Sequence, residues 1–124
     1  MNRENTNKLK ALAPKFLSKL DGIYCSDTWF NVLSHLFQVI EHHINYDVPS
    51  ELQPSIYAVQ VKEKFGTLRV YANQHTPFIN GAIALAEGLS SNICESCSSF
   101  GIIRNGNIVR VLCDACHSKL SLSK

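Results

Sequence analysis

Four cysteines near the end of the chain are the residues whose type and spacing point most directly to chemistry. They form two C-x-x-C pairs, Cys94 with Cys97 and Cys113 with Cys116, and fifteen residues separate the pairs. This spacing lies in the range of structural zinc sites, in which four thiolates surround one ion. The sequence therefore predicts a zinc ribbon that holds Zn²⁺, although iron accepts the same sulfurs.

The predicted site is closed to catalysis. Four thiolates fill a tetrahedral ion and leave no position for water, and His117, directly after Cys116, is not needed as a ligand. A redox C-x-x-C site would leave the second pair unexplained. Because the first ten residues are polar and lack an export signal, we expect a cytoplasmic protein with free thiols rather than disulfides.

The segment between the cysteine pairs is expected to fold as a β-hairpin. Residues 100–104 and 107–112 are rich in β-forming side chains, and the Asn105-Gly106 pair between them favours a two-residue type I′ turn. Such a turn pairs Ile103 with Ile108. Alternation then divides the ribbon into one face with Phe100, Ile102, Arg104, Val109 and Val111 and another with Ile103, Ile108, Arg110 and Leu112. Apolar residues on both faces indicate that the body or a partner covers the ribbon.

Charge excludes some classes of protein. Twelve Lys and Arg against ten Asp and Glu give a net charge of +2, and four thiolates with one Zn²⁺ bring the loaded protein to about zero. A strongly basic nucleic-acid arm and an acidic tail are both excluded. No apolar run approaches the roughly 18 residues of a membrane span.

The elements that position the cysteines are predicted to form an α+β body over residues 1–91, joined to a ribbon module over 92–124. Residues 1–8 are expected to be frayed, and apolar residues recur at helical spacing from Leu9 to Ile23, with Pro14 at the start of that helix or at a kink. Ser26 or Asp27 is expected to cap a central helix over residues 28–46.

The second half of the body is predicted as a hairpin and a helix. Residues 56–62 and 67–72 are β-prone and are expected to pair as antiparallel strands joined by residues 63–66. Thr76 and Pro77 then cap and open a third helix that runs to about Ser90.

Other candidate residues are weaker. His35, His42 and His43 lie on the polar stripe of the central helix together with Glu41, and this stripe is expected to be solvated rather than metal-binding. Cys25 is expected to be a small core residue. We find no phosphate loop, paired acids or H-E-x-x-H motif, and therefore expect no enzyme.

The order of three segments along the chain is similar to that in a known group of proteins. The segment Gln60 to Tyr71, QVKEKFGTLRVY, is followed by ICESC at 93–97 and VLCDAC at 111–116. This order resembles a group of small uncharacterised proteins of bacteria, phages and prophages, over about the C-terminal half of the chain. Ser98 stands where a glycine commonly follows a zinc knuckle. The resemblance implies an accessory role, including anti-CRISPR-like inhibition of a defence complex by direct binding.

Protein recognition by a non-enzymatic zinc ribbon is the preferred interpretation. The residues expected to contact the partner lie on the ribbon and around the first hairpin turn: Ile103, Arg104, Ile108, Arg110, Lys62, Lys64 and Arg69. The alternative is a ribbon that binds DNA or RNA through Arg104, Arg110 and Lys119 with the same turn cations. A redox or hydrolytic enzyme has the least support.

Overall fold

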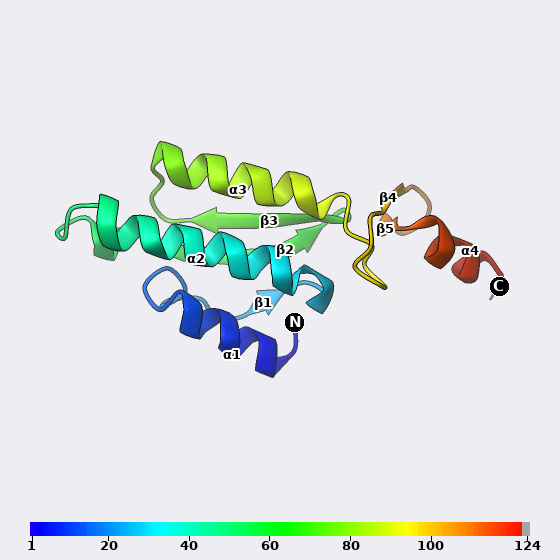
Figure 1. Ribbon diagram of the computed structural model, residues 1–124, viewed down its shortest axis with the longest axis horizontal. Coiled ribbons are helices and arrows are strands. Elements are labelled where there is room, and N and C mark those ends of the chain that lie inside the picture. The colour runs from blue at the N-terminus through cyan, green and yellow to red at the C-terminus, as the bar shows by residue number, and fades with distance from the viewer. Residues whose placement is uncertain (123–124) are drawn as a thin grey trace.

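The computed structural model describes residues 1–122. Four helices and two small sheets give the expected α+β class (Figure 1). In chain order the elements are α1 (Arg3–Leu12), β1 (Ile23–Tyr24), η1 (Asp27–Trp29), α2 (Phe30–Asp47), η2 (Gln53–Ser55), β2 (Ala58–Lys64), β3 (Thr67–Ala72), α3 (Pro77–Ser90), β4 (Ile102–Arg104), β5 (Arg110–Leu112) and α4 (Asp114–Leu122).

The first helix begins and ends earlier than predicted. Asn2 caps α1 by accepting a hydrogen bond from the backbone N–H of Asn5, so residues expected to be frayed are helical. The helix ends two residues before Pro14, because proline disfavours helical backbone in the residue before it. Asp27 accepts from the N–H of Asn2 and the side-chain amide of Asn5, and these bonds lower the pKa of its carboxyl.

The central helix, α2, matches its prediction. Ser26 accepts a hydrogen bond from the N–H of Thr28 and so caps the short helix η1, which continues into α2. Phe37, Ile40 and Ile44 on α2 are fully buried and belong to the main core. This apolar face gives α2 its central place, between α1 and α3 (Figure 1).

The predicted hairpin is present, but its turn is shorter. Strand β2 runs to Lys64, which pairs with Thr67, so Phe65 and Gly66 alone form the connection. Both have positive φ, 52° and 84°, as a type I′ turn requires. Strand β1, which was not predicted, adds to β2 in parallel and gives the order β1-β2-β3.

Helix α3 covers the free edge of β3. Thr76 caps it and Pro77 is its first residue, as predicted. Near its C-terminal end, Ser90 accepts from the N–H of Leu68 and Glu87 accepts from the N–H of Val70. These two bonds satisfy donors that an edge strand would otherwise leave open.

The cysteine-bearing region lies at one end of the molecule, beyond the β2–β3 turn (Figure 1). Val111 and Leu112 of β5 are buried. Gly66 meets this region closely, because a Cβ at Gly66 would lie 3.3 Å from Cγ1 of Val109. Within residues 1–122 no helix has both the length and the apolar character needed to cross a membrane.

Candidate metal centre

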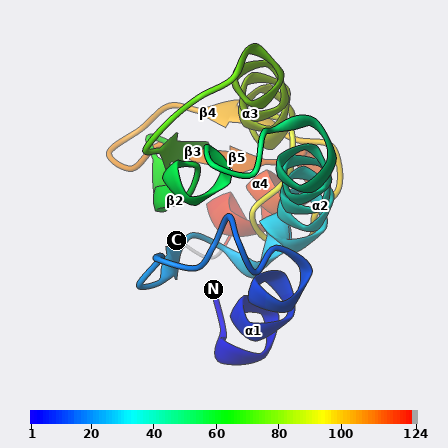
Figure 2. The ribbon, with the colours of Figure 1, turned by 90° about the vertical axis from the view of Figure 1, so that its left-hand side faces the viewer.

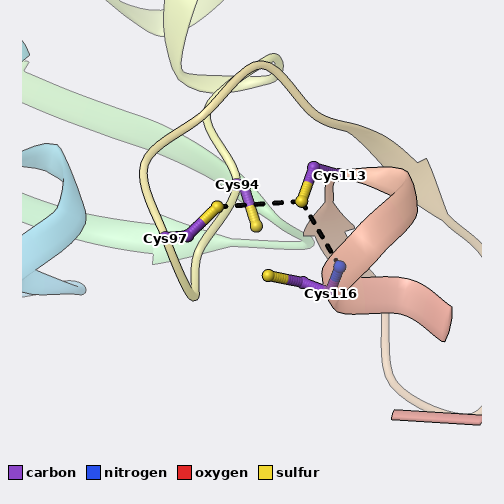
Figure 3. Close-up of side chains that lie close together, drawn as sticks. All are labelled: Cys94, Cys97, Cys113 and Cys116. Atoms are coloured by element: carbon purple, nitrogen blue, oxygen red, sulfur yellow. Dashed lines mark hydrogen bonds between the residues drawn. The ribbon is translucent and has the colours of Figure 1, made fainter. Parts of the chain in front are cut away.

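The four predicted cysteines meet at one point in space (Figure 3). Their sulfur atoms all lie within 4.8 Å of one another, and those of Cys97 and Cys113 are 3.7 Å apart. A tetrahedral ion with Zn–S bonds of about 2.3 Å requires sulfurs about 3.8 Å apart, whereas a disulfide requires about 2.05 Å. The arrangement can therefore hold a single metal ion.

Both cysteine pairs begin with the same turn. The N–H of Ser98 donates to the carbonyl of Cys94, and the N–H of His117 donates to the carbonyl of Cys113. Beyond this bond the two turns differ. Ser98 has a φ of 69° and reverses the chain. His117, in contrast, lies inside α4, which begins at Asp114 and was not predicted.

The serine after the first pair takes the backbone conformation that glycine favours. A left-handed φ is uncommon for residues other than glycine, asparagine and aspartate, and it accounts for glycine being common at this position. The turn is closed by a 2.7 Å bond from the N–H of Cys94 to the carbonyl of Ser99. Ser98 therefore replaces the glycine while the turn keeps its hydrogen bonds.

Hydrogen bonds prepare some of the sulfurs to ionise. The hydroxyl and N–H of Ser99 lower the pKa of Cys97 to about 6. Burial opposes ionisation of Cys94, but backbone N–H groups of Cys113, Ser96 and Cys97 outweigh it and lower the pKa. Cys113 receives a 3.4 Å hydrogen bond from the N–H of Cys116 (Figure 3).

The fourth cysteine, Cys116, differs from Cys97 and Cys94 in the direction in which its pKa is shifted. A hydrogen bond with Cys113, together with those to Cys97 and Cys94, raises the pKa of Cys116 to about 12. Crowding of the sulfurs thus opposes loss of the last proton. A divalent cation would offset this repulsion, because thiolates bound to a metal are deprotonated outright. The donor set fits a cation.

The predicted register of the ribbon hairpin is wrong. Ile103 pairs with Val111, and Arg104 pairs with Arg110, so the connection spans residues 105–109 instead of Asn105 and Gly106 alone. Partners across an antiparallel ladder point to the same face. The two arginines therefore share a face, rather than lying on opposite faces.

Each of these arginines is bound to an acidic residue beside a cysteine. Arg104 donates to Asp114 at 2.7 Å and Arg110 donates to Glu95 at 3.4 Å. Asp114 follows Cys113 and Glu95 follows Cys94. These two acids were not among the predicted site residues, although each directly follows the first cysteine of its pair in the sequence.

The histidine stripe does not form a second metal site. Among residues 1–122 the four cysteines are the only group of three or more potential ligands close enough to share an ion. The expected solvation is wrong for two members, because Glu41 and His43 are buried. His43 hydrogen-bonds to Asp47 and Thr76 and stacks on Phe78, which ties α2 to the start of α3.

Cys25 is isolated from the metal centre. It packs against the hydrophobic core, and burial raises the pKa of its thiol to about 12. A neutral, partly buried thiol is a poor nucleophile.

Lys62, Lys64 and Arg69, the cations around the turn between β2 and β3, lie on one face of the sheet. Lys62 pairs with Arg69 across β2 and β3, and Lys64 pairs with Thr67 in the next row of the same face.

The two isoleucines of the ribbon lie in different segments. Ile103 lies on β4, and Ile108 lies in the 105–109 connection. The roles in partner binding assigned to all of these residues stay predictions.

No protein-family model, curated protein or solved structure matches the chain.

Proposed function

We propose that this protein is a non-enzymatic zinc-ribbon protein that recognises another protein through its ribbon end. In this proposal Cys94, Cys97, Cys113 and Cys116 bind one Zn²⁺ that links the two turns of the ribbon. A structural zinc ion contributes on the order of 10 kcal/mol to folding of such a module. The ion's task is to hold the hairpin rigid.

Zinc is preferred to an iron–sulfur cluster on geometric grounds. A cluster of several iron atoms needs its four cysteine sulfurs further apart, because the irons and bridging sulfides lie between them. Sulfurs within 4.8 Å of one another suit one ion. A closed set of four thiolates is typical of structural zinc and leaves no site for a reacting water.

The observation that carries the proposal is the exposure of apolar side chains around β4. Phe100 and Ile108 are 73% and 68% exposed, and Ile102 and Ile103 are also exposed. Val111 and Leu112 of β5 are buried, whereas β4 pairs, within residues 1–122, with β5 alone. An apolar edge strand that is left open suits pairing with an extended segment of a partner.

Phe65 is a further exposed apolar residue, and packing of the core does not explain its place. Its side chain is 72% exposed and its φ is 52°. Bulky residues rarely adopt this left-handed backbone, so Phe65 costs stability without contributing to the core. Residues kept in strained conformations cluster at functional sites. Gly66, its neighbour, contacts the ribbon at Val109, which places Phe65 beside the ribbon end.

The alternative of a nucleic-acid-binding ribbon receives less support. Arg104 and Arg110 are already bound to Asp114 and Glu95, so phosphate would have to displace a carboxylate at each. The resemblance to phage and prophage proteins favours a host protein as the partner, and we include a bacterial defence complex in the proposal.

Capture experiments with matched variants test this function. Zinc-loaded protein is immobilised and exposed to bacterial lysate, and Ile108→Ser is compared with Leu52→Ser, which alters an exposed apolar residue away from the ribbon. We expect a protein retained by the wild type and by Leu52→Ser but lost from Ile108→Ser. Equal retention by both variants, or no retained protein from any host, would contradict the proposal.

A further variant separates binding from stability. Phe65→Asn creates an Asn-Gly turn, the preferred type I′ pair, so it should raise the free energy of unfolding by several tenths of a kcal/mol. We expect this more stable protein to bind its partner less well. Unchanged capture by Phe65→Asn would remove Phe65 from the interface.

A further inference from the structure

The face of the three-stranded sheet that points away from the helices is lined by cations and aromatic rings. The pairing register sets Tyr24, Lys62 and Arg69 in one row across β1, β2 and β3. The next row on one side holds Gln60 and Tyr71, and the next on the other holds Lys64 and Thr67. Figure 2 shows the helices α2 and α3 on the other side of this sheet.

The inner face of the same strands is apolar and buried. Val61, Leu68 and Val70 alternate with the outward residues and are part of the core. The outward tyrosines are not needed there: Tyr24 is 59% exposed and Tyr71 is 42% exposed. The sheet therefore has one face that folding requires and one face that it leaves free.

Positive charge on this outer face is not neutralised by the protein. Just before β2, the ammonium of Lys19 lies 4.7 Å from the ring centre of Tyr57. Within residues 1–122 the ion pairs involve neither the lysines and the arginine of the two rows nor Lys19. Glu63 alternates with Lys62 and Lys64 along β2, is exposed, and accepts from the N–H of Gly66.

One acidic residue contacts a side chain of this face. Asp21 accepts a hydrogen bond from the hydroxyl of Tyr24 at 3.3 Å. The three rows hold three cations, Lys62, Lys64 and Arg69, and no Asp or Glu. The overall charge of the loaded protein is close to zero, so this concentration of positive charge is local.

Two exposed rings with cations between them suit a particular ligand. Tyr24 and Tyr71 lie on the two outer strands, and Lys62 lies on the strand between, so two strand spacings of about 4.8 Å separate the rings across the sheet. In single-stranded nucleic acid, bases stack on aromatic side chains while phosphates follow a positive groove. An acidic peptide would use the cations but would leave the rings without a stacking partner.

We propose that this outer face, defined by Tyr24, Lys62, Lys64, Arg69 and Tyr71, binds single-stranded nucleic acid. Bases stack on the two tyrosines, and phosphates contact the three cations between and beside them. Duplexes bind less well because their bases are already stacked on one another. The site uses none of the ribbon residues and does not depend on the proposed protein recognition through the ribbon. It assigns Lys62, Lys64 and Arg69, which the sequence analysis expected to contact a protein partner, to nucleic acid instead.

Fluorescence anisotropy of a labelled twelve-nucleotide oligo(dT) or oligo(U) tests this site with the zinc-loaded full chain. Three phosphate contacts predict a slope of about −2 for log affinity against log salt, or roughly fifteenfold weaker binding at 200 mM than at 50 mM salt. The double variant Lys62→Gln/Arg69→Gln should lower the slope to about −0.7. Arg3→Gln/Lys8→Gln on α1 makes the same change in charge and should leave binding within twofold.

Two substitutions of Tyr71 distinguish binding by base stacking from binding by electrostatic attraction alone. Tyr71→Ala should weaken binding at least fivefold, whereas Tyr71→Phe, which keeps the ring, should bind like the wild type. The proposal is overturned if the α1 control weakens binding as much as the sheet variant. It is equally overturned if a duplex or poly-glutamate binds as tightly as the single strand, or if nothing binds at 50 mM salt.

Discussion

The guanidinium of Arg104 binds the carboxylate of Asp114 at 2.7 Å, and its Nε donates to the carbonyl of Leu112 at 3.2 Å. Leu112 and Asp114 are the residues on either side of Cys113. One side chain from β4 therefore holds the backbone carbonyl before a candidate ligand and the side chain after it. Arg110 contacts only the residue that follows the other candidate ligand, Cys94, by donating to Glu95 at 3.4 Å.

Arg104 is expected to hold metal in place without contacting it. Arg104→Gln should release zinc to a chelator up to about tenfold faster, because groups that orient the ligands contribute to affinity on this scale. Lys119→Gln on α4 removes the same charge and serves as the control. Release measured with a coloured chelator should separate the two variants. If Arg104→Gln and Lys119→Gln release zinc at equal rates, the prediction that Arg104 orients the ligands is contradicted.

Gly101 allows the close approach of two segments beside the metal centre. A Cβ there would lie 2.9 Å from the carbonyl carbon of Leu112 and 3.0 Å from the N of Cys113. Gly101→Ala should therefore move Cys113 and reduce zinc retention. Gly106→Ala is the matched control, since its Cβ would meet nothing closer than 3.9 Å. If both variants retain zinc like the wild type, the contact is not needed.

Glu41 joins α2 to the segment after α1. Its two carboxylate oxygens accept from the N–H groups of Lys15 at 3.0 Å and Phe16 at 2.9 Å. Glu41→Ala leaves one buried and one partly buried N–H without a partner and should lower the free energy of unfolding by about 2–4 kcal/mol. Urea denaturation would measure this. Glu4→Ala on the exposed face of α1 should change stability by less than about 0.5 kcal/mol; a similar loss in both would contradict the assigned role.

The thiol of Cys25 should resist alkylation in the folded protein. With its pKa raised to about 12, roughly one molecule in ten thousand carries the thiolate at pH 8. Mass spectrometry after iodoacetamide should find Cys25 unmodified in the native protein and modified in guanidinium. Labelling at the same rate in both states would contradict this burial.

The same shift predicts a loss of stability at high pH. The unfolded chain releases the Cys25 proton near the ordinary thiol pKa of 9.0, whereas in the folded chain the pKa is about 12. The unfolded state therefore binds fewer protons between these values, and the free energy of unfolding falls as pH rises through that window. Cys25→Ala should remove this part of the pH dependence.

The metal centre was predictable because its information is local. Each C-x-x-C turn sets its own ligand spacing, and nothing distant is needed to recognise it. The central helix and the Thr76–Pro77 start of α3 were predictable for the same reason, since a periodic apolar face and a cap are both read from neighbouring residues.

The register of the ribbon depended on contacts that local preferences do not contain. Asn105-Gly106 is the better type I′ sequence, yet Phe65-Gly66 forms the two-residue turn. In the ribbon, Val111 and Leu112 are buried and the cysteines fix both ends, so these constraints shift the pairing by three residues from the predicted one. The parallel pairing of β1 with β2 likewise joins residues far apart in the chain.

Polar residues of α2 show the same limit. Glu41 and His43 fall on the polar stripe of the helix, but the segment after α1 and the start of α3 cover them. Helical periodicity identifies the side of a helix that faces the core, but it does not reveal which polar residues a neighbouring segment will bury and satisfy.

Elemental analysis of the purified protein, before and after chelation, tests the central claim most directly. We expect one zinc ion per chain, no iron–sulfur absorbance, and loss of the ion in Cys113→Ser but not in Cys25→Ser. Protein that is folded without metal, or that carries iron in place of zinc, would contradict it.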